Sequence, residues 1–126
     1  MASSDPANPL MILVAGPLRG GTGDDPVLIQ RNIDAMTEVA LGLYRQGHLP
    51  IVGEWLSIPL IEAAGSTQIG DAIYDEIQHP LAQRLLAKCD GCLRIGAASS
   101  GADLMVETAR ALGKPVWFSV DEIRGG

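Results

Sequence analysis

The chain has 126 residues, of which 47% are hydrophobic and 19% charged, and its formal net charge is −6 at pH 7. This length and composition predict a single globular domain over residues 1–126 and exclude a disordered chain. The acidic balance argues against nucleic acid as a partner, because phosphate binding needs clustered Lys and Arg. No apolar run approaches the roughly 18–20 residues of a membrane span, so we expect no membrane partner.

The first ten residues, MASSDPANPL, lack a basic segment followed by an apolar one. We therefore expect no signal peptide, a loose tail over residues 1–8 and a cytoplasmic protein.

Cys89 and Cys92 form a C-x-x-C pair. A redox pair normally lies at a helix N-terminus that lowers a thiol pKa, whereas this pair lies where a helix runs into a strand. A zinc site needs about four ligands, and no second Cys or His pair is present. We interpret the two cysteines as small buried apolar residues, with a redox or metal role as the alternative, and expect no cofactor and no metal.

The chain reads as an alternation of strands and helices. Asp25 and Pro26 are suited to the N-cap and first position of a helix, and Pro80 should kink or divide the helix that contains it. In chain order we expect a strand at Pro9–Gly16, a helix from Val27 to about Arg45, a strand at His48–Val52, a short helix or ordered loop after it, a helix from Asp71 to about Lys88, a strand at Asp90–Gly96, a helix at Ala102–Leu112, a strand within residues 114–120 and a tail with one possible helical turn.

This alternation predicts an α/β fold with a parallel sheet of four to five strands and helices on both faces. Ligands bind such sheets at the carboxyl ends of the strands. The loops GPLRGGTG, GEW and GAASSG each follow a predicted strand, so we expect them to converge there.

The first of these loops carries Arg19 among Gly16, Gly20 and Gly21. Glycines let backbone N–H groups approach a ligand closely, and the planar guanidinium suits phosphate or carboxylate. The loop matches neither the phosphate loop of NTPases nor G-x-G-x-x-G. We predict that these four residues bind ligand, the alternative being a flexible loop with a solvated arginine.

The other two loops supply further candidates. Ser99, Ser100 and Gly101 open a helix, where hydroxyl and N–H groups could bind an anion, although a serine could also serve only as the cap. Glu54 could bind hydroxyl groups, and Trp55 could stack on a base or lie at a subunit interface. His79 could reach the mouth of the site, whereas His48 is expected to be structural.

Three segments, ILVAGPLRGG, CDGCLRI and SSGADLMVETARALGKPV, resemble the nucleoside 2-deoxyribosyltransferase superfamily, and the likeness runs from about Leu10 to Phe118. GPLRGG is particularly similar to the first loop of its 2'-deoxynucleoside 5'-phosphate N-hydrolases. The resemblance, to a short bacterial branch, implies a flavodoxin-like or Rossmann-like sheet and cleavage of an N-glycosidic bond by a helix-borne glutamate. It also implies a second carboxylate and a neighbouring subunit at the site.

Both expected carboxylates are absent when the motifs are matched position by position. The family's glutamate follows the turn glycine by four residues, and Gly101 places that position at Met105. The family's aspartate lies eight residues before the aspartate that opens the third strand, Asp90, so its position is Ala82. Met105 is expected either to pack in the core or to line the site as a polarisable apolar side chain.

Other carboxylates do not fall at family positions. Glu107 is about 200° around the helix from Met105, so it should point away, three residues from Arg110 as in a solvated pair. Asp103 is also off the family pattern. Glu54, Glu107 and His79 are therefore the weak candidates for a relocated catalytic group.

The sequence thus predicts a binding protein for a nucleoside-like or nucleotide-like ligand that lacks ordinary deoxyribosyl transfer. The alternative is a hydrolase or transferase that cleaves an N-glycosidic bond with relocated acids. We also expect a homo-oligomer, a dimer or tetramer, with the apolar segment Trp55–Ile61 at the interface.

Overall fold

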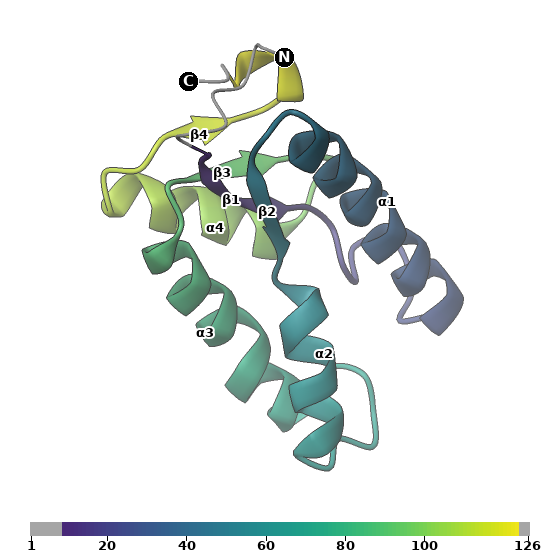
Figure 1. Ribbon diagram of the computed structural model, residues 1–126. Helices are drawn as coiled ribbons and strands as arrows, with labels where there is room; N and C mark the ends of the chain where they lie inside the picture. Colours follow the sequence, from purple (N-terminus) through teal and green to yellow (C-terminus); the bar gives the residue numbers. More distant parts are fainter. Residues whose placement is uncertain (1–8, 124–126) are drawn as a thin grey trace.

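The computed structural model describes residues 9–123, so the tail expected over residues 1–8 lies outside the described part. A parallel sheet of four strands forms its centre, in the order β2-β1-β3-β4 (Figure 1). The strands are β1 Met11–Ala15, β2 Leu49–Val52, β3 Gly91–Arg94 and β4 Val116–Trp117. β1 pairs with both β2 and β3, with Leu13 opposite Ile51 on one side and Cys92 on the other. The predicted α/β fold with a parallel sheet is confirmed.

Four α-helices and a short 3₁₀-helix connect or follow the strands. They are α1 Pro26–Arg45, α2 Glu54–Ala63, α3 Ala72–Lys88, α4 Ser100–Ala111 and η1 Val120–Glu122. In Figure 1, α1 lies on one side of the sheet, α3 and α4 lie on the other, and α2 extends below β2 beside α3. Among the described residues, no helix is long and apolar enough to cross a membrane.

Local side-chain chemistry explains where the helices begin. The Asp25 carboxylate accepts a hydrogen bond from the Val27 N–H at 2.9 Å, and Pro26 occupies the first turn, as predicted. Asp71 caps α3 by accepting from the N–H groups of Ile73 and Tyr74. Side-chain capping of this kind stabilises a helix by about 1 kcal/mol.

The two helix-interior prolines do not stop their helices. Pro80, expected to kink or divide its helix, lies inside the 17-residue α3 and does not divide it, and Pro59 lies inside the 10-residue α2. Each proline removes one backbone hydrogen bond but leaves the rest of the ladder in place. The segment after Glu54 is therefore a helix rather than an ordered loop.

Alternate residues of the strands fill two cores, one on each face of the sheet. Ile12 and Val14 of β1 pack with Met36 and Leu43 of α1. Leu13 of β1, on the opposite face, packs in a second cluster with Leu86, Cys92, Met105 and Ala109. This two-sided burial is typical of a parallel sheet whose strands are apolar throughout.

Candidate ligand site

A cavity of about 170 Å³ opens at the carboxyl ends of β1, β2 and β3. Its walls come from the loop after β1 and from the N-terminal parts of α2, α3 and α4, so the loops predicted to converge do so. The residues that line it are Leu13, Val14, Ala15, Gly16, Leu18, Arg19, Gly20, Gly53, Glu54, Ser57, Tyr74, Asp75, Gln78, His79, Ala82, Ser99, Ser100, Gly101, Ala102 and Met105.

Most of the residues singled out from the sequence face this cavity. Those that line it are Gly16, Arg19, Gly20, Glu54, His79, Ala82, Ser99, Ser100, Gly101 and Met105. Gly21, Trp55 and Glu107 do not line it. The sequence therefore identified the loops that line this cavity but not the direction of every side chain.

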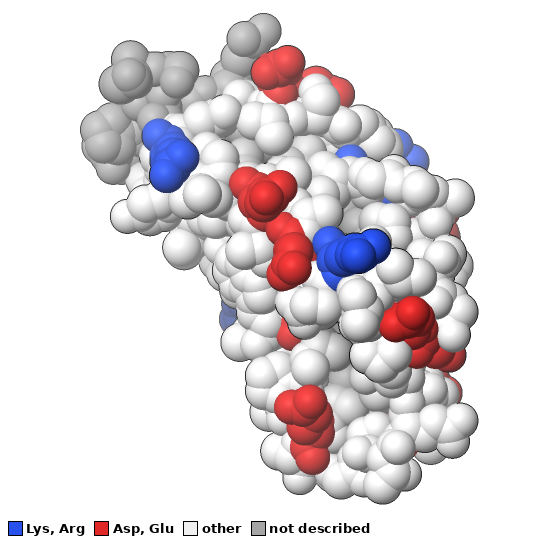
Figure 2. Space-filling view, turned by 90° about the vertical axis from the view of Figure 1, so that its right-hand side faces the viewer, with Lys and Arg blue, Asp and Glu red and all other residues white. Residues whose placement is uncertain are grey.

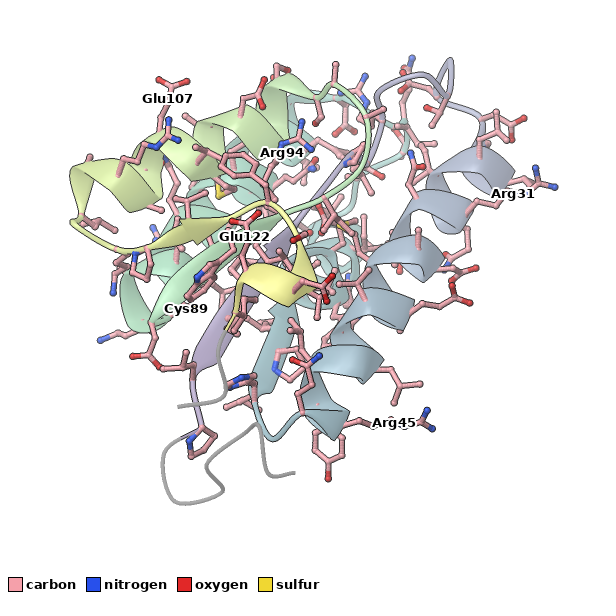
Figure 3. The ribbon with its side chains drawn as sticks, turned by 90° about the horizontal axis from the view of Figure 1, so that it is seen from above. Arg31, Arg45, Cys89, Arg94, Glu107 and Glu122 are labelled. Atoms are coloured by element: carbon pink, nitrogen blue, oxygen red, sulfur yellow. The ribbon has the colours of Figure 1, made fainter. Side chains whose placement is uncertain are left out.

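Each of the three exceptions has a local cause. Gly21 adopts φ +76° in the exposed turn before α1 and faces outward. Trp55 follows Glu54 by about 100° around α2, and its indole N–H donates to Thr37 Oγ1 on α1 at 3.1 Å. Glu107 is exposed and points away from the sheet, as its spacing predicts (Figure 3).

Arg19 is held by an acidic partner in its own loop. Its Nε and Nη2 donate to the two carboxylate oxygens of Asp24 at 2.8 and 2.9 Å, and its guanidinium lies over Gly70, where no Cβ would fit. This bidentate contact raises the pKa of Arg19 and lowers that of Asp24. The pairing fixes the plane of the guanidinium while Nη1 makes no hydrogen bond with any described residue.

The N-terminus of α4 forms the opposite wall. The Ser99 hydroxyl caps the helix by accepting from the Ala102 N–H at 3.2 Å. The first N–H groups of a helix have no intrahelical partner and carry partial positive charge, so those of Ser100 and Gly101 suit an anionic or carbonyl group. A Cβ on Gly101 would lie 2.9 Å from His79 Nε2, so the absence of a side chain here lets the imidazole lie against the start of α4.

Arg94, which the sequence reasoning did not select, organises the loop that carries this wall. Arg94 is only 9% exposed at the end of β3. It donates to the carbonyl oxygens of Ile95, Gly96 and Ala97 at 2.5, 3.4 and 3.0 Å, and its Nε lies 3.3 Å from an Asp103 carboxylate oxygen. Figure 3 shows Arg94 beneath the N-terminal end of α4. A buried arginine among loop carbonyls is visible only once the chain is folded.

Glu54 and Ser57 provide the polar groups of the α2 wall. Glu54 begins α2 directly after Gly53, and burial raises the pKa of its carboxyl group. Ser57 is 1% exposed, and its Oγ has no hydrogen-bond partner among the described residues. Sequence reasoning missed Ser57 because its neighbours in WLSIPLI are apolar and gave no sign that it faces inward.

The two positions that the resemblance assigns to carboxylates are apolar and both line the cavity. Met105 is 4% exposed and packs in the second core with Ala102 and Ala109 of α4. Ala82 lies across from Gly53, where a Cβ would be 3.6 Å from the alanine Cβ. Neither side chain can act as a nucleophile or hold a balancing charge.

The cysteine pair lies in the second core rather than at a reactive site. Cys89 and Cys92 are buried and unpaired. Burial raises their pKa values to about 11 and about 12, so both are thiols at neutral pH. No group of three or more His, Cys, Asp or Glu residues suited to a metal ion occurs within residues 9–123.

Comparison with known proteins identifies the fold. No protein-family model matches the chain, and no curated protein matches it. A solved structure of a 2-deoxyribosyltransferase from the psychrotolerant bacterium Bacillus psychrosaccharolyticus, described as a biocatalyst for nucleoside synthesis, is similar with a TM-score of 0.59 and 15% sequence identity. The similarity covers 84% of this chain and 69% of that protein. The chain therefore has the α/β fold of a deoxyribosyltransferase.

Proposed function

We propose that the protein binds a nucleoside-like or nucleotide-like ligand in this cavity and does not carry out ordinary deoxyribosyl transfer. The observation that carries the proposal is the lining: Arg19 and the start of α4 are present, and Met105 and Ala82 are apolar at the positions that the resemblance assigns to carboxylates. We also propose a cytoplasmic location, where free thiols such as Cys89 and Cys92 persist.

The lining suits a ligand with one anionic end and one apolar face. Arg19 Nη1 and the first N–H groups of α4 supply donors for a phosphate or a comparable group. Leu13, Ala102 and Met105 supply an apolar surface in the same cavity, which suits the uncharged part of such a ligand. These features support a nucleoside monophosphate as the first ligand to test.

Arg19→Ala is expected to weaken binding of nucleoside monophosphates about tenfold, because a charge-assisted hydrogen bond contributes about 1.5–3 kcal/mol. Isothermal titration calorimetry with a set of nucleoside monophosphates measures this. Arg45→Ala is the matched control, because Arg45 lies at the far end of α1, outside the cavity (Figure 3).

A second control separates ligand contact from loop stability. Asp24→Asn removes the carboxylate that competes for Arg19 and keeps a residue type that tolerates the φ of +60° at this position. Its affinity should equal or exceed that of the wild type. If Arg19→Ala and Asp24→Asn lose affinity equally, Arg19 acts by holding the loop and not by contacting the ligand. If no nucleotide binds to the wild type, the proposed function is contradicted.

A second candidate function is hydrolysis of an N-glycosidic bond with Glu54 as the relocated acid. The observation that favours it is that Glu54 lines the same cavity as Arg19 and Ser100, with a carboxyl pKa raised by burial. A carboxyl group whose pKa is raised holds its proton to higher pH, which suits a group that protonates a departing base. In this reading Glu54 is the general acid and water is the nucleophile.

Glu54→Gln is expected to abolish any base release and to stabilise the protein without ligand at pH 7. Because the folded-state pKa is raised, ionisation of Glu54 costs stability as pH rises from about 4.5 through the folded pKa, and each unit of elevation corresponds to about 1.4 kcal/mol. The gain in free energy of unfolding should therefore be present at pH 7 and vanish at pH 3. Release of base by Glu54→Gln at the wild-type rate would rule out the second candidate.

We propose that the protein forms a homo-oligomer through the outer face of α2. Trp55, Leu56 and Leu60 are 38%, 42% and 49% exposed, and the lower part of the molecule, where α2 lies, carries few charges in Figure 2. Ser57 and Ile61, within the predicted interface segment, face inward instead. Light scattering should give a mass of two or four chains that Leu60→Glu reduces to one; a monomeric wild type at working concentration would contradict this.

A further inference from the structure

Helix α2 turns polar groups as well as an isoleucine inward and leaves large apolar side chains exposed. Its two buried residues are Ser57 and Ile61, and Glu54 lies on the same face one turn earlier. Its outer face carries Trp55, Leu56 and Leu60. A helix that only covered a core would turn its apolar side inward. The inward polar pair therefore needs an explanation within the cavity.

Of the two inward polar residues, Ser57 most needs an explanation. Its hydroxyl group is buried and lacks a partner among the described residues, and Ser57 is one of the residues that line the cavity. A buried hydroxyl without a partner costs free energy that an alanine at the same place would not. The other buried side-chain nitrogen or oxygen without a partner in residues 9–123 is His48 Nε2, and His48 does not line the cavity. Ser57 thus presents an unused donor and acceptor beside the place where a ligand would lie.

We propose that Glu54 and Ser57 form one subsite that binds two adjacent hydroxyl groups of the ligand, as in the cis-diol of a ribose. This inference rests on the proposed function and names the sugar that the site selects. One ligand hydroxyl donates to the Glu54 carboxyl group, and its neighbour pairs with the Ser57 hydroxyl, which can both donate and accept. The spacing of three residues places both groups on one face of α2.

The apolar walls beside this pair support the assignment, and the other polar side chains of the cavity, Tyr74, Asp75, Gln78 and His79, come from α3. The nearby walls formed by Ala82, Ala102 and Met105 offer no side-chain hydrogen-bonding group to a sugar hydroxyl. Arg19 is committed in part to Asp24, and the Ser99 hydroxyl caps α4. A 2'-deoxyribose would supply a single hydroxyl to this subsite and would leave the Ser57 hydroxyl unpaired. The subsite therefore favours ribonucleosides over 2'-deoxyribonucleosides.

The test compares ribonucleoside 5'-monophosphates with their 2'-deoxy counterparts by calorimetric titration of the full chain. We expect the preferred ribonucleotide to bind about tenfold more tightly than its deoxy form. In Ser57→Ala, the ribonucleotide should lose about tenfold while the deoxynucleotide is unchanged, so that the preference disappears. Ser119→Ala, which removes an exposed hydroxyl far along the chain from α2, should leave both affinities unchanged.

Thermal unfolding without ligand gives an independent readout. Ser57→Ala should keep or raise the midpoint temperature, because it removes a hydroxyl that has no internal partner. A lower midpoint would assign the hydroxyl to the fold and overturn the inference. Equal or tighter binding of the deoxynucleotide to the wild type would also overturn it while leaving the proposed function intact, whereas failure of all the nucleotides to bind would overturn both.

Discussion

Met105→Glu combined with Ala82→Asp is expected to release free base from 2'-deoxynucleosides or their monophosphates, whereas the wild type is expected to release none. Both positions line the cavity, so the substitutions bring a nucleophile and a second carboxylate into the same space. Carboxylates that attack or stabilise C1' in this way are the general device of glycoside chemistry. Chromatography of incubated substrates measures the released base.

The same change has a large cost in stability. Met105 is 4% exposed within an apolar cluster, so a carboxylate there loses hydration without gaining a partner. Met105→Glu should lower the free energy of unfolding by about 2–3 kcal/mol at pH 7. Because burial raises the pKa of an introduced carboxyl group, the loss should shrink towards pH 4.

Met105→Gln separates the two effects. It has nearly the same shape as the glutamate variant and carries no charge, so it should be destabilised less at pH 7 and should release no base with Ala82→Asp present. Strong base release by the wild type would contradict the interpretation of Met105 outright, because a thioether cannot act as the family's nucleophile.

The alternation of strands and helices was predictable because the position of each strand and helix depends on the chemistry of neighbouring residues in the sequence. The apolar run before Gly16 marks a strand buried on both faces, and Asp25 with Pro26 marks a helix start, so both could be placed from the sequence alone. The arrangement of parallel strands then brings their carboxyl ends together without further information. The sequence alone therefore predicts that Arg19, Glu54 and Ser99 lie around one site.

Side-chain partners were not predictable, because they depend on which elements pack together. Trp55 follows Glu54 directly, yet Trp55 turns towards Thr37 of α1 while Glu54 turns into the cavity. Ser57 lies in an apolar segment of which Trp55, Leu56 and Leu60 are exposed while Ser57 and Ile61 are buried. Periodicity shows that a helix has two faces but does not show which face meets the sheet when both are apolar in part.

The role of Arg94 in holding the loop after β3 could not be predicted from the sequence. Its replacement should have the largest combined effect on the stability of the fold and on ligand binding. Arg94→Ala is expected to lower the free energy of unfolding by about 2–4 kcal/mol, because it removes charge-assisted hydrogen bonds to the carbonyls of residues 95–97. It should also weaken ligand binding more than tenfold, because the same loop positions Ser99 and Gly101. Chemical denaturation and calorimetric titration measure the two effects.

Variants of Arg94 and of neighbouring charged residues test whether the forked guanidinium group causes the losses of stability and of ligand binding. Arg94→Lys keeps the charge but cannot reach several carbonyls at once, so it should recover only part of both losses. Asp103→Asn should cost under about 1 kcal/mol, because the Asp103 side chain is 63% exposed and its contact with Arg94 is 3.3 Å long. Arg110→Ala, on the exposed side of α4, should change neither quantity. If Arg94→Lys matched the wild type in both measurements, charge alone would account for the role of Arg94; if it falls between wild type and Arg94→Ala, the geometry of the fork holds the loop that forms the wall of the cavity.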